Sequence, residues 1–420
     1  VAGSIASVPK ATDQGPSMRP FDGRRILLVV SGGIAAYKSV ILLRGLRAAG
    51  AEVEVLMTSA AERFVGRVTF EALAGRPVHT DLWTNPLAHI ELGRDSDLTV
   101  VAPATADLIS AMAHGRADGL ATATLLAADG PVLACPAMNL RMWENSATRR
   151  NIELLTGDGV QFVGPAHGEL AEGETGIGRM AEPEEIMIVA GRILEPESDL
   201  AGRKVVVTAG PTREAIDPVR FMGNRSSGRM GFELAASAWR RGAEVVCIHG
   251  PVSVAPPLGP RLVQVENAVS MLAALQDELD GCSVLCMAAA VADFQVEQPS
   301  NEKIKKDELR GGKLALELAP GPDLLLETAR QRAAAGVFTL GFALETTDGI
   351  SNATAKLERK SMNLVALNQA GAQDAGFEVE TNRVTLIDPS GSVEELPLLS
   401  KRETADRLLD RIEDRLRDGD

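Results

Sequence analysis

The chain has 420 residues, 45% of them hydrophobic, and 57 Asp and Glu against 43 Lys and Arg give it a formal net charge of −14 at pH 7. This length predicts two or three domains, and the apolar content excludes wholesale disorder. The negative charge disfavours nucleic acid as a partner, and no apolar run reaches the roughly 20 residues that a membrane-spanning helix requires.

Residues 1–23 are small, polar and contain Pro and Gly, so we expect a flexible tail there. From residue 24 to 190, short apolar runs alternate with helical patterns. Arg24–Val30 has the composition of a buried parallel strand, and Ala35–Ala49 has the spacing of a helix that stops at Gly50. The alternation continues through strands at 52–57, 98–102, 131–135 and 160–163 and helices at 62–74 and 106–113. This order predicts an α/β domain with a doubly wound parallel sheet.

A charged segment with Pro and Gly, residues 191–203, predicts a linker. The alternation then restarts, and residues 204–420 are expected to form a second, Rossmann-like α/β domain. Within it, Pro389-Ser390-Gly391 lies between two short apolar runs, which is typical of a β-hairpin, and an amphipathic helix is expected over 401–417. The other predicted strands lie at 204–209, 244–249, 261–265, 283–287, 337–342 and 364–367, with helices at 231–241 and 269–279.

Four predicted strand-to-helix loops of the first domain consist of small or hydroxyl-bearing residues. Because the carboxyl ends of parallel strands share one edge, these loops are expected to meet there. Helix N-termini and Ser or Thr hydroxyls suit a phosphate group, although such residues also cap helices without any ligand. GxGxxG is absent after the first strand, which favours FMN over NAD. The candidate cofactor-binding residues are Ser31, Gly32, Gly33, Thr58, Ser59, Pro103, Ala104, Thr105 and Met138.

His89 and Asn139 are two further polar candidates in the first domain. A histidine can transfer a proton near neutral pH, and an amide can bind a carboxylate without forcing its protonation. A surface histidine and a simple helix cap explain these two positions equally well.

The segments SGGIAAYK, HIELGR, APATADL, PAMNLRMW and GETGIGRM occur in this order. Together they resemble the flavoprotein 4′-phosphopantothenoylcysteine decarboxylases over residues 24–190. The resemblance implies a flavodoxin-like fold, a trimer with FMN bound between subunits, His89 as the essential histidine and Asn139 as the residue that grips the substrate carboxylate. In such an enzyme FMN oxidises the substrate thiol, which allows the adjacent carboxylate to leave as CO₂.

One position departs from this family. Its flap usually carries a cysteine that donates the proton of the final reduction, whereas Glu172 stands there in this chain. A carboxyl of raised pKa, or a water molecule, is then the expected donor, and Glu172 is a candidate catalytic residue. The alternative is that only the second domain is active and the first is an FMN-binding assembly or regulatory module.

The second domain has a long polar loop, residues 217–228, and Asp293 at the end of an apolar run. Long loops in compact domains are often functional, and lysines near such an acid, including Lys303, could neutralise a triphosphate and its Mg²⁺. Lys356 and Lys360 are four residues apart and so share one helix face. A solvated loop and solvated lysines are the alternative. GxxxxGK[ST] is absent, which excludes an ordinary P-loop.

TAGPTREAIDPVRFMGNRSSGRMG, AAAVADF, EKIKK, GPDLL, GFALET and KLERK resemble 4′-phosphopantothenate–cysteine ligase over residues 200–400. The resemblance implies that CTP converts the pantothenate carboxylate into an acyl-cytidylate and that cysteine then displaces CMP. It also implies that Lys303 serves the activation step and that Asn224 covers the acyl-cytidylate. The implied CTP-binding residues are Asp293, Lys303, Pro322, Asp323, Leu324, Phe342, Lys356 and Lys360.

A decarboxylase followed by a ligase resembles the bacterial bifunctional proteins of coenzyme A biosynthesis. This implies FMN and Mg²⁺ as cofactors, three small-molecule substrates and a homo-oligomer, namely a dodecamer with trimeric decarboxylases and dimeric ligases. The four cysteines form no CxxC pair or disulfide framework, and the N-terminus has no apolar signal segment, so we expect a cytoplasmic protein without membrane contact.

Overall fold

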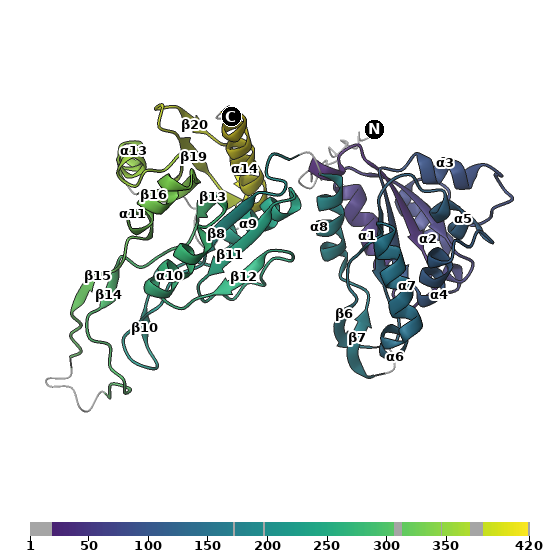
Figure 1. Cartoon of the computed structure of the whole chain (residues 1–420), viewed down its shortest axis with the longest axis horizontal. Helices are drawn as coiled ribbons and strands as arrows, with labels where there is room; N and C mark the ends of the chain where they lie inside the picture. Colours follow the sequence, from purple (N-terminus) through teal and green to yellow (C-terminus); the bar gives the residue numbers. More distant parts are fainter. Residues whose placement is uncertain are drawn as a thin grey trace, which may run out of the picture. The chain divides into compact units, whose positions relative to one another are not determined.

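The chain forms two compact units, residues 1–195 and 196–420, each with its own sheet (Figure 1). The computed structural model describes residues 19–170, 173–195, 198–305, 313–345, 347–369 and 381–418.

The first unit contains a five-stranded parallel sheet in the order β2-β1-β3-β4-β5. Its strands are β1 (Arg25–Val30), β2 (Glu52–Met57), β3 (Leu98–Ala104), β4 (Val132–Pro136) and β5 (Gln161–Phe162). Every residue of β3 is buried, as expected for a strand covered on both faces.

Helices cover both faces of this sheet, which confirms the predicted doubly wound fold. Along β1, Ile26 and Leu28 point into one apolar core and Leu27 and Val29 into the other. The first core receives side chains from α1 (Ala36–Ala48), α2 (Arg67–Ala74) and α8 (Pro183–Leu194). The second receives them from α3 (Ala88–Arg94), α4 (Ala106–Ala113), α5 (Leu120–Leu126) and α7 (Ser146–Gly157).

Two predicted boundaries of the first unit need correction. The 3₁₀ turn η1 (Arg19–Phe21) buries Phe21 completely in the core, so ordered packing begins before residue 24. The helix expected over 62–74 is divided into η2 (Ala61–Arg63) and α2, because the chain at Gly66 is extended. Residues 1–18 of the expected tail lie outside the described residues.

The linker expected over 191–203 is also misplaced. α8 continues to Leu194, which is 5% exposed, because its apolar positions keep helical spacing and pack on the first core. On the other side, Leu200 is fully buried in the core of the second unit. The division between the units therefore falls at residues 195 and 196.

The second unit contains an eight-stranded sheet in the order β12-β11-β8-β13-β16-β17-β19-β20. Six strands are parallel, and the predicted hairpin at the end adds β19 and β20 in antiparallel orientation. The strands are β8 (Lys204–Ala209), β11 (Glu244–His249), β12 (Arg261–Gln264), β13 (Cys282–Met287), β16 (Phe338–Glu345), β17 (Leu364–Gln369), β19 (Val384–Ile387) and β20 (Val393–Glu395).

Helices again cover both faces. On one face lie α9 (Arg229–Arg240) and α14 (Lys401–Asp418), and on the other lie α10 (Ala268–Glu278), α11 (Leu324–Glu327) and α13 (Gly349–Arg359), with α12 (Ala329–Ala334) following α11. Three two-stranded ribbons complete the unit: β9 (Glu214–Ala215) with β10 (Phe221–Met222), β14 (Phe294–Val296) with β15 (Leu318–Pro320), and β18 (Thr381–Asn382) with β21 (Leu399–Ser400). Figure 1 shows β14 and β15 as an arm that projects from the sheet.

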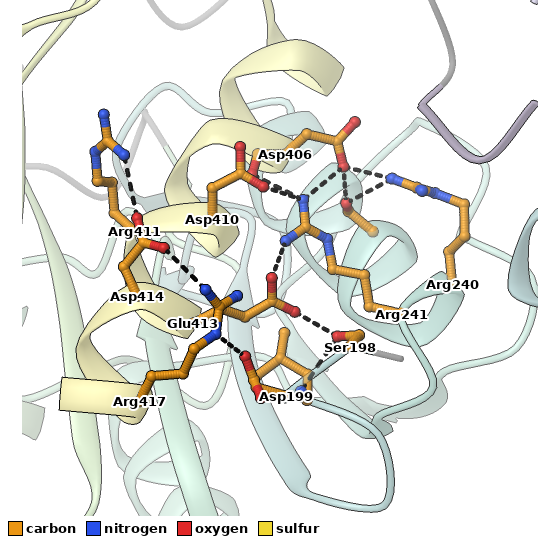
Figure 2. A network of polar contacts seen from close by, with 12 residues as sticks. Ser198, Asp199, Arg240, Arg241, Asp406, Asp410, Arg411, Glu413, Asp414 and Arg417 are labelled. Atoms are coloured by element: carbon orange, nitrogen blue, oxygen red, sulfur yellow. Dashed lines mark hydrogen bonds and ion pairs between the residues drawn. The ribbon is translucent and has the colours of Figure 1, made fainter. Parts of the chain in front are cut away.

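A buried ion-pair network fastens α14 to the end of α9 (Figure 2). Arg241, 2% exposed, donates to Asp410 and Glu413 at 2.9 Å each, and Arg240 pairs with Asp406. The Ser198 hydroxyl donates to Glu413, and Arg417 donates to Asp199, so the start and the end of the second unit are joined. Among the described residues, no helix has the length and apolar character that a bilayer crossing requires.

Candidate active sites

A cavity of about 1120 Å³ lies at the carboxyl edge of the first sheet. It brings together all four predicted loops, as expected for a doubly wound fold. Of the predicted cofactor-binding residues, the cavity is lined by Ser31, Gly32, Gly33, Thr58, Ser59, Thr105 and Met138. Pro103 and Ala104 are not among the lining residues, because they end the fully buried strand β3.

Close packing explains the residue types in these loops. A Cβ atom on Gly32 would lie 2.4 Å from Cβ of Ala60, so only glycine allows the loops after β1 and β2 to approach this closely. Ser31 is 2% exposed, and its hydroxyl donates to the carbonyl oxygen of Pro103 at 2.6 Å. The N–H of Thr105, which caps α4, donates in turn to Ser31 Oγ at 3.2 Å. Pro103 thus holds Ser31, which lines the cavity, without lining the cavity itself.

A hairpin of β6 (Ala166–Glu169) and β7 (Thr175–Arg179) packs against the loop after β4. The N–H of Met138 donates to the carbonyl oxygen of Gly178 at 3.0 Å, and a Cβ on Gly178 would lie 2.2 Å from Met138 O. The hairpin contributes Glu169, Leu170, Gly178 and Arg179 to the cavity. Glu172, which falls between these two strands in the sequence, lies outside the described residues.

An ionic cluster at the base of this hairpin was missed by the sequence analysis. The side chain of Lys38, 6% exposed, donates to the carbonyl oxygen of Met180 at 2.9 Å and to Glu182 at 2.8 Å. Arg179 also binds Glu182, at 3.0 Å. Lys38, Arg179 and Met180 line the cavity. The sequence offered one signal for this cluster, because Lys38 belongs to the segment SGGIAAYK that contains the glycine turn. It was overlooked because a lysine on a helix is usually exposed to solvent.

Asn139 and His89 occupy different surroundings. Asn139 lines the cavity and caps α6 (Leu140–Glu144), with its Oδ1 accepting from the N–H of Arg141 at 2.8 Å. His89 lies on α3 and is not among the lining residues, and its buried Nδ1 has no hydrogen-bond partner among the residues that the structure describes. Cys135 on β4 is completely buried and is not among the lining residues, and its burial raises the pKa of its thiol.

Several of the predicted nucleotide residues of the second unit lie close together at the carboxyl edge of its sheet, after β13 and β16. Lys356 on α13 donates to the carbonyl oxygen of Phe342 on β16 at 2.9 Å, and Lys360 pairs with Asp323 at 2.8 Å. The N–H of Gly321, next to Pro322, donates to the carbonyl oxygen of Asp293 at 2.8 Å. Leu324 is 3% exposed and packs in the core, so its side chain is not available to a ligand.

The charges of this cluster shift one another's pKa values. Burial, followed by repulsion from Lys360, lowers the pKa of Lys356, although Glu345, Asp293 and Asp323 oppose the shift. Burial raises the pKa of Asp323, but the hydrogen bond and charge of Lys360 outweigh it and leave the pKa below its usual value. The cluster is therefore a partly desolvated site that combines two lysines with three carboxylates.

Asn224 lies close to this edge, whereas Lys303 lies on the segment that follows β14 of the projecting arm. Asn224 donates through its side chain to the carbonyl oxygen of Val291 at 2.9 Å, two residues before Asp293. Lys303 is exposed on the segment that follows β14.

Comparison with known proteins assigns a class to each half. Residues 15–193 match the family described as Flavoprotein, and residues 200–416 match the DNA/pantothenate metabolism flavoprotein C-terminal domain. The chain therefore combines a flavoprotein domain with a pantothenate-metabolism domain.

The full-length relatives identify the combination. Over 398 residues the chain is 42% identical to the coenzyme A biosynthesis bifunctional protein CoaBC of Bacillus subtilis, with 93% of this chain and 97% of that protein covered. The CoaBC protein of Mycobacterium bovis is 43% identical over 404 residues, covering 93% and 96%. A crystal structure of a CoaBC C-terminal domain is 37% identical and covers 52% of this chain and 98% of that one, with a TM-score of 0.44. The chain belongs to the CoaBC family of bifunctional enzymes of coenzyme A biosynthesis, which confirms the resemblance read from the motifs.

Proposed function

We propose that the second unit joins 4′-phosphopantothenate to cysteine through an acyl-cytidylate made from CTP. The first unit then decarboxylates 4′-phosphopantothenoylcysteine to 4′-phosphopantetheine. The observation that carries this proposal is the match to CoaBC relatives over both units in the same order. We place the reaction in the cytoplasm, where reduced cysteines like the four free ones of this chain persist.

FMN fits the cavity of the first unit. Its volume is about 1120 Å³, and three residues that carry hydroxyl groups, Thr58, Ser59 and Thr105, line it together with Gly32 and Gly33. These residues would hold the FMN phosphate beside the N-termini of α1 and α4. Bound FMN supplies the oxidation of the substrate thiol that makes loss of CO₂ possible. Asn139 would hold the substrate carboxylate through its amide.

His89 would act from a neighbouring copy of the chain. It is absent from the lining of its own cavity, and the exposed apolar side chains of Leu87 and Ile90 flank it. Ile34 and Tyr37, at the rim of the cavity, are 66% and 53% exposed. Apolar surface of this kind favours burial against another subunit. A trimer built this way, combined with a dimer of second units, would form the dodecamer that the resemblance implies.

In the second unit, Lys356 and Lys360 would neutralise the phosphates of CTP, to which Mg²⁺ would add further positive charge, with Asp293 and Phe342 nearby. Lys303 would stabilise the charge that develops at the α-phosphate as pyrophosphate leaves. Asn224, held by Val291 at the same edge, would cover the acyl-cytidylate until the cysteine amine displaces CMP.

Mass spectrometry of the products tests both activities. The purified protein is incubated with 4′-phosphopantothenate, cysteine, CTP and Mg²⁺, and we expect 4′-phosphopantetheine to accumulate. His89→Asn should stop the sequence at 4′-phosphopantothenoylcysteine, and Lys303→Gln should prevent pyrophosphate release. If the wild-type protein stops at 4′-phosphopantothenoylcysteine, the first unit is an FMN-binding assembly module, and if neither product forms, the proposal is wrong.

The same assay assigns the role of Glu172. If Glu172→Gln decarboxylates at the wild-type rate, Glu172 is not the proton donor and water takes that part. A selective loss of the final reduction would make its carboxyl the replacement for the flap cysteine.

A further inference from the structure

A buried carboxylate occupies the turn between β9 and β10. The side chain of Asp217 is completely excluded from solvent. Its Oδ1 accepts from the N–H groups of Val219 and Arg220 at 2.8 Å each, which forms the turn itself. Its Oδ2 accepts from the Arg220 guanidinium at 2.9 Å and from the N–H of Ile304 at 3.2 Å. Asp217 therefore links its own turn to a segment 87 residues away.

Arg220 completes the grip on the same distant residue. Its second guanidinium nitrogen donates to the carbonyl oxygen of Ile304 at 3.1 Å. Both backbone polar groups of Ile304 are thus bound by one Asp–Arg pair. A third contact, from the N–H of Ser300 to the carbonyl oxygen of Ile216 at 3.0 Å, fixes the preceding part of the segment.

The turn that makes these contacts is itself fixed to the sheet. Glu214, 5% exposed, accepts from the N–H of Ala268 at the start of α10 at 3.0 Å. Arg213 donates through its N–H to the carbonyl oxygen of Glu266 at 2.8 Å, and its guanidinium lies over the Phe221 ring at 4.3 Å. The turn that carries Asp217 and Arg220 is therefore attached to the start of α10.

The segment held by this pair leaves the arm of β14 and β15. Pairing of β14 with β15 ends at Val296 and Leu318, followed by one hydrogen bond from Glu297 to Glu317 at 3.0 Å. Beyond that point, the contacts with the β9–β10 turn place the backbone that carries Lys303, the residue immediately before Ile304. A lysine side chain has four rotatable bonds, so its reach is set by where its backbone is held.

We propose that Asp217 is a positioning residue for the ligase reaction: together with Arg220 it clamps Ile304 and thereby places Lys303 for the activation of the pantothenate carboxylate. This inference rests on the proposed function, from which the role of Lys303 comes. Because its side chain is completely buried, Asp217 would act through the backbone of Ile304 and not by contact with the substrate or the nucleotide. A shift of about 1 Å in a group that stabilises a transition state can lower the rate about 100-fold.

Asp217→Asn tests the clamp. The amide keeps one oxygen for the turn, but its NH₂ group now faces the N–H of Ile304 and the Arg220 guanidinium, which are both donors. Asp388→Asn is the matched control, because Asp388 also accepts from two N–H groups of its own turn, those of Ser390 and Ser392, and also pairs with an arginine, Arg415. Its side chain is 6% exposed, and it lies on the β19–β20 hairpin.

The measurements separate positioning from a general loss of structure. Pyrophosphate release is followed in a single turnover with 4′-phosphopantothenate and Mg²⁺–CTP, and the second half-reaction is followed with isolated acyl-cytidylate and cysteine. We expect Asp217→Asn to slow pyrophosphate release by about 10- to 100-fold, with the KM for CTP and the second half-reaction nearly unchanged. Asp388→Asn should leave both half-reactions at the wild-type rate.

Equal losses in both half-reactions, or no greater loss in Asp217→Asn than in Asp388→Asn, would overturn the positioning role. If Asp217→Asn does not fold, Arg220→Met gives the same test, because its side chain is 42% exposed and it removes the bond to the Ile304 carbonyl. Lys303→Gln distinguishes the proposed role of Lys303 from the clamp on Ile304. If it releases pyrophosphate normally, both the proposed role of Lys303 and the clamp fail, whereas a defective Lys303→Gln beside a normal Asp217→Asn rejects the clamp alone.

Discussion

Single atoms decide how closely the loops around the first cavity approach one another. Gly32 and Gly178 both lie where a Cβ atom would meet backbone atoms of a neighbouring segment, at Ala60 and Met138 respectively. Neither glycine has a positive φ, so its purpose here is close approach and not an unusual backbone conformation. Substitutions at these sites should therefore act on the cavity through displacement of a whole loop.

Gly178→Ala is expected to move the hairpin of β6 and β7 away from the loop that carries Met138 and Asn139. The added Cβ would lie 2.2 Å from Met138 O, so one of the two segments must shift. We expect turnover of 4′-phosphopantothenoylcysteine to fall by about 10- to 100-fold, while ligase turnover in the same chain stays unchanged. Gly157→Ala is the control, since its Cβ would meet nothing within 4 Å. Unaltered decarboxylation by Gly178→Ala would contradict this account.

At the scale of elements, α14 depends on charged contacts that sequence periodicity does not reveal. Its apolar positions Leu408, Leu409 and Ile412 are fully buried, as an amphipathic pattern predicts. Three acidic residues of this helix, Asp406, Asp410 and Glu413, also point inward and pair with Arg240 or Arg241 (Figure 2). Because these charges are largely desolvated, the loss of one partner leaves the others buried and uncompensated.

Arg241→Met should therefore lower the free energy of unfolding of the second unit by about 3–5 kcal/mol. The arginine binds three carboxylates, those of Asp406, Asp410 and Glu413, and is 2% exposed. Chemical denaturation followed by circular dichroism measures the change. Arg411→Met is the matched control on the same helix, because the ion pair between Arg411 and Glu394 is 43% and 40% exposed and should contribute about 1 kcal/mol or less. Similar losses in both variants would show that burial of the network does not matter.

At the scale of the whole molecule, each unit has two apolar cores of its own, one on each face of its sheet. We therefore expect two unfolding transitions in calorimetry. Mg²⁺–CTP at about 100 times its Kd should stabilise the second unit by about 2.7 kcal/mol and leave the unfolding temperature of the first unit unchanged. A single transition that moves as a whole with CTP would instead show that the units unfold together.

The alternation of strands and helices, the doubly wound sheet of the first unit, the α/β fold of the second unit and the family could be predicted from local patterns, whereas the helices α5, α7 and α8 were not predicted. Buried parallel strands form short apolar runs, and the loops after them carry small residues whose convergence follows from the topology. Boundaries were less predictable: Phe21 and Leu194 belong to a core, but nothing in their immediate neighbours shows which surface they pack against. Glu172 remains a prediction from the sequence alone.

The sequence by itself determined the two-domain α/β architecture, the family and the set of candidate residues, because these depend on periodicity and on motifs contained within short segments. Only the tertiary structure decided which residues meet across the chain, including residues that the sequence did not single out. Lys38 reaches Met180 and Glu182 across more than 140 residues, and Asp217 reaches Ile304 across 87. Hydrogen bonds between such distant segments depend on where the folded backbone places each donor and acceptor, and no local pattern encodes that placement.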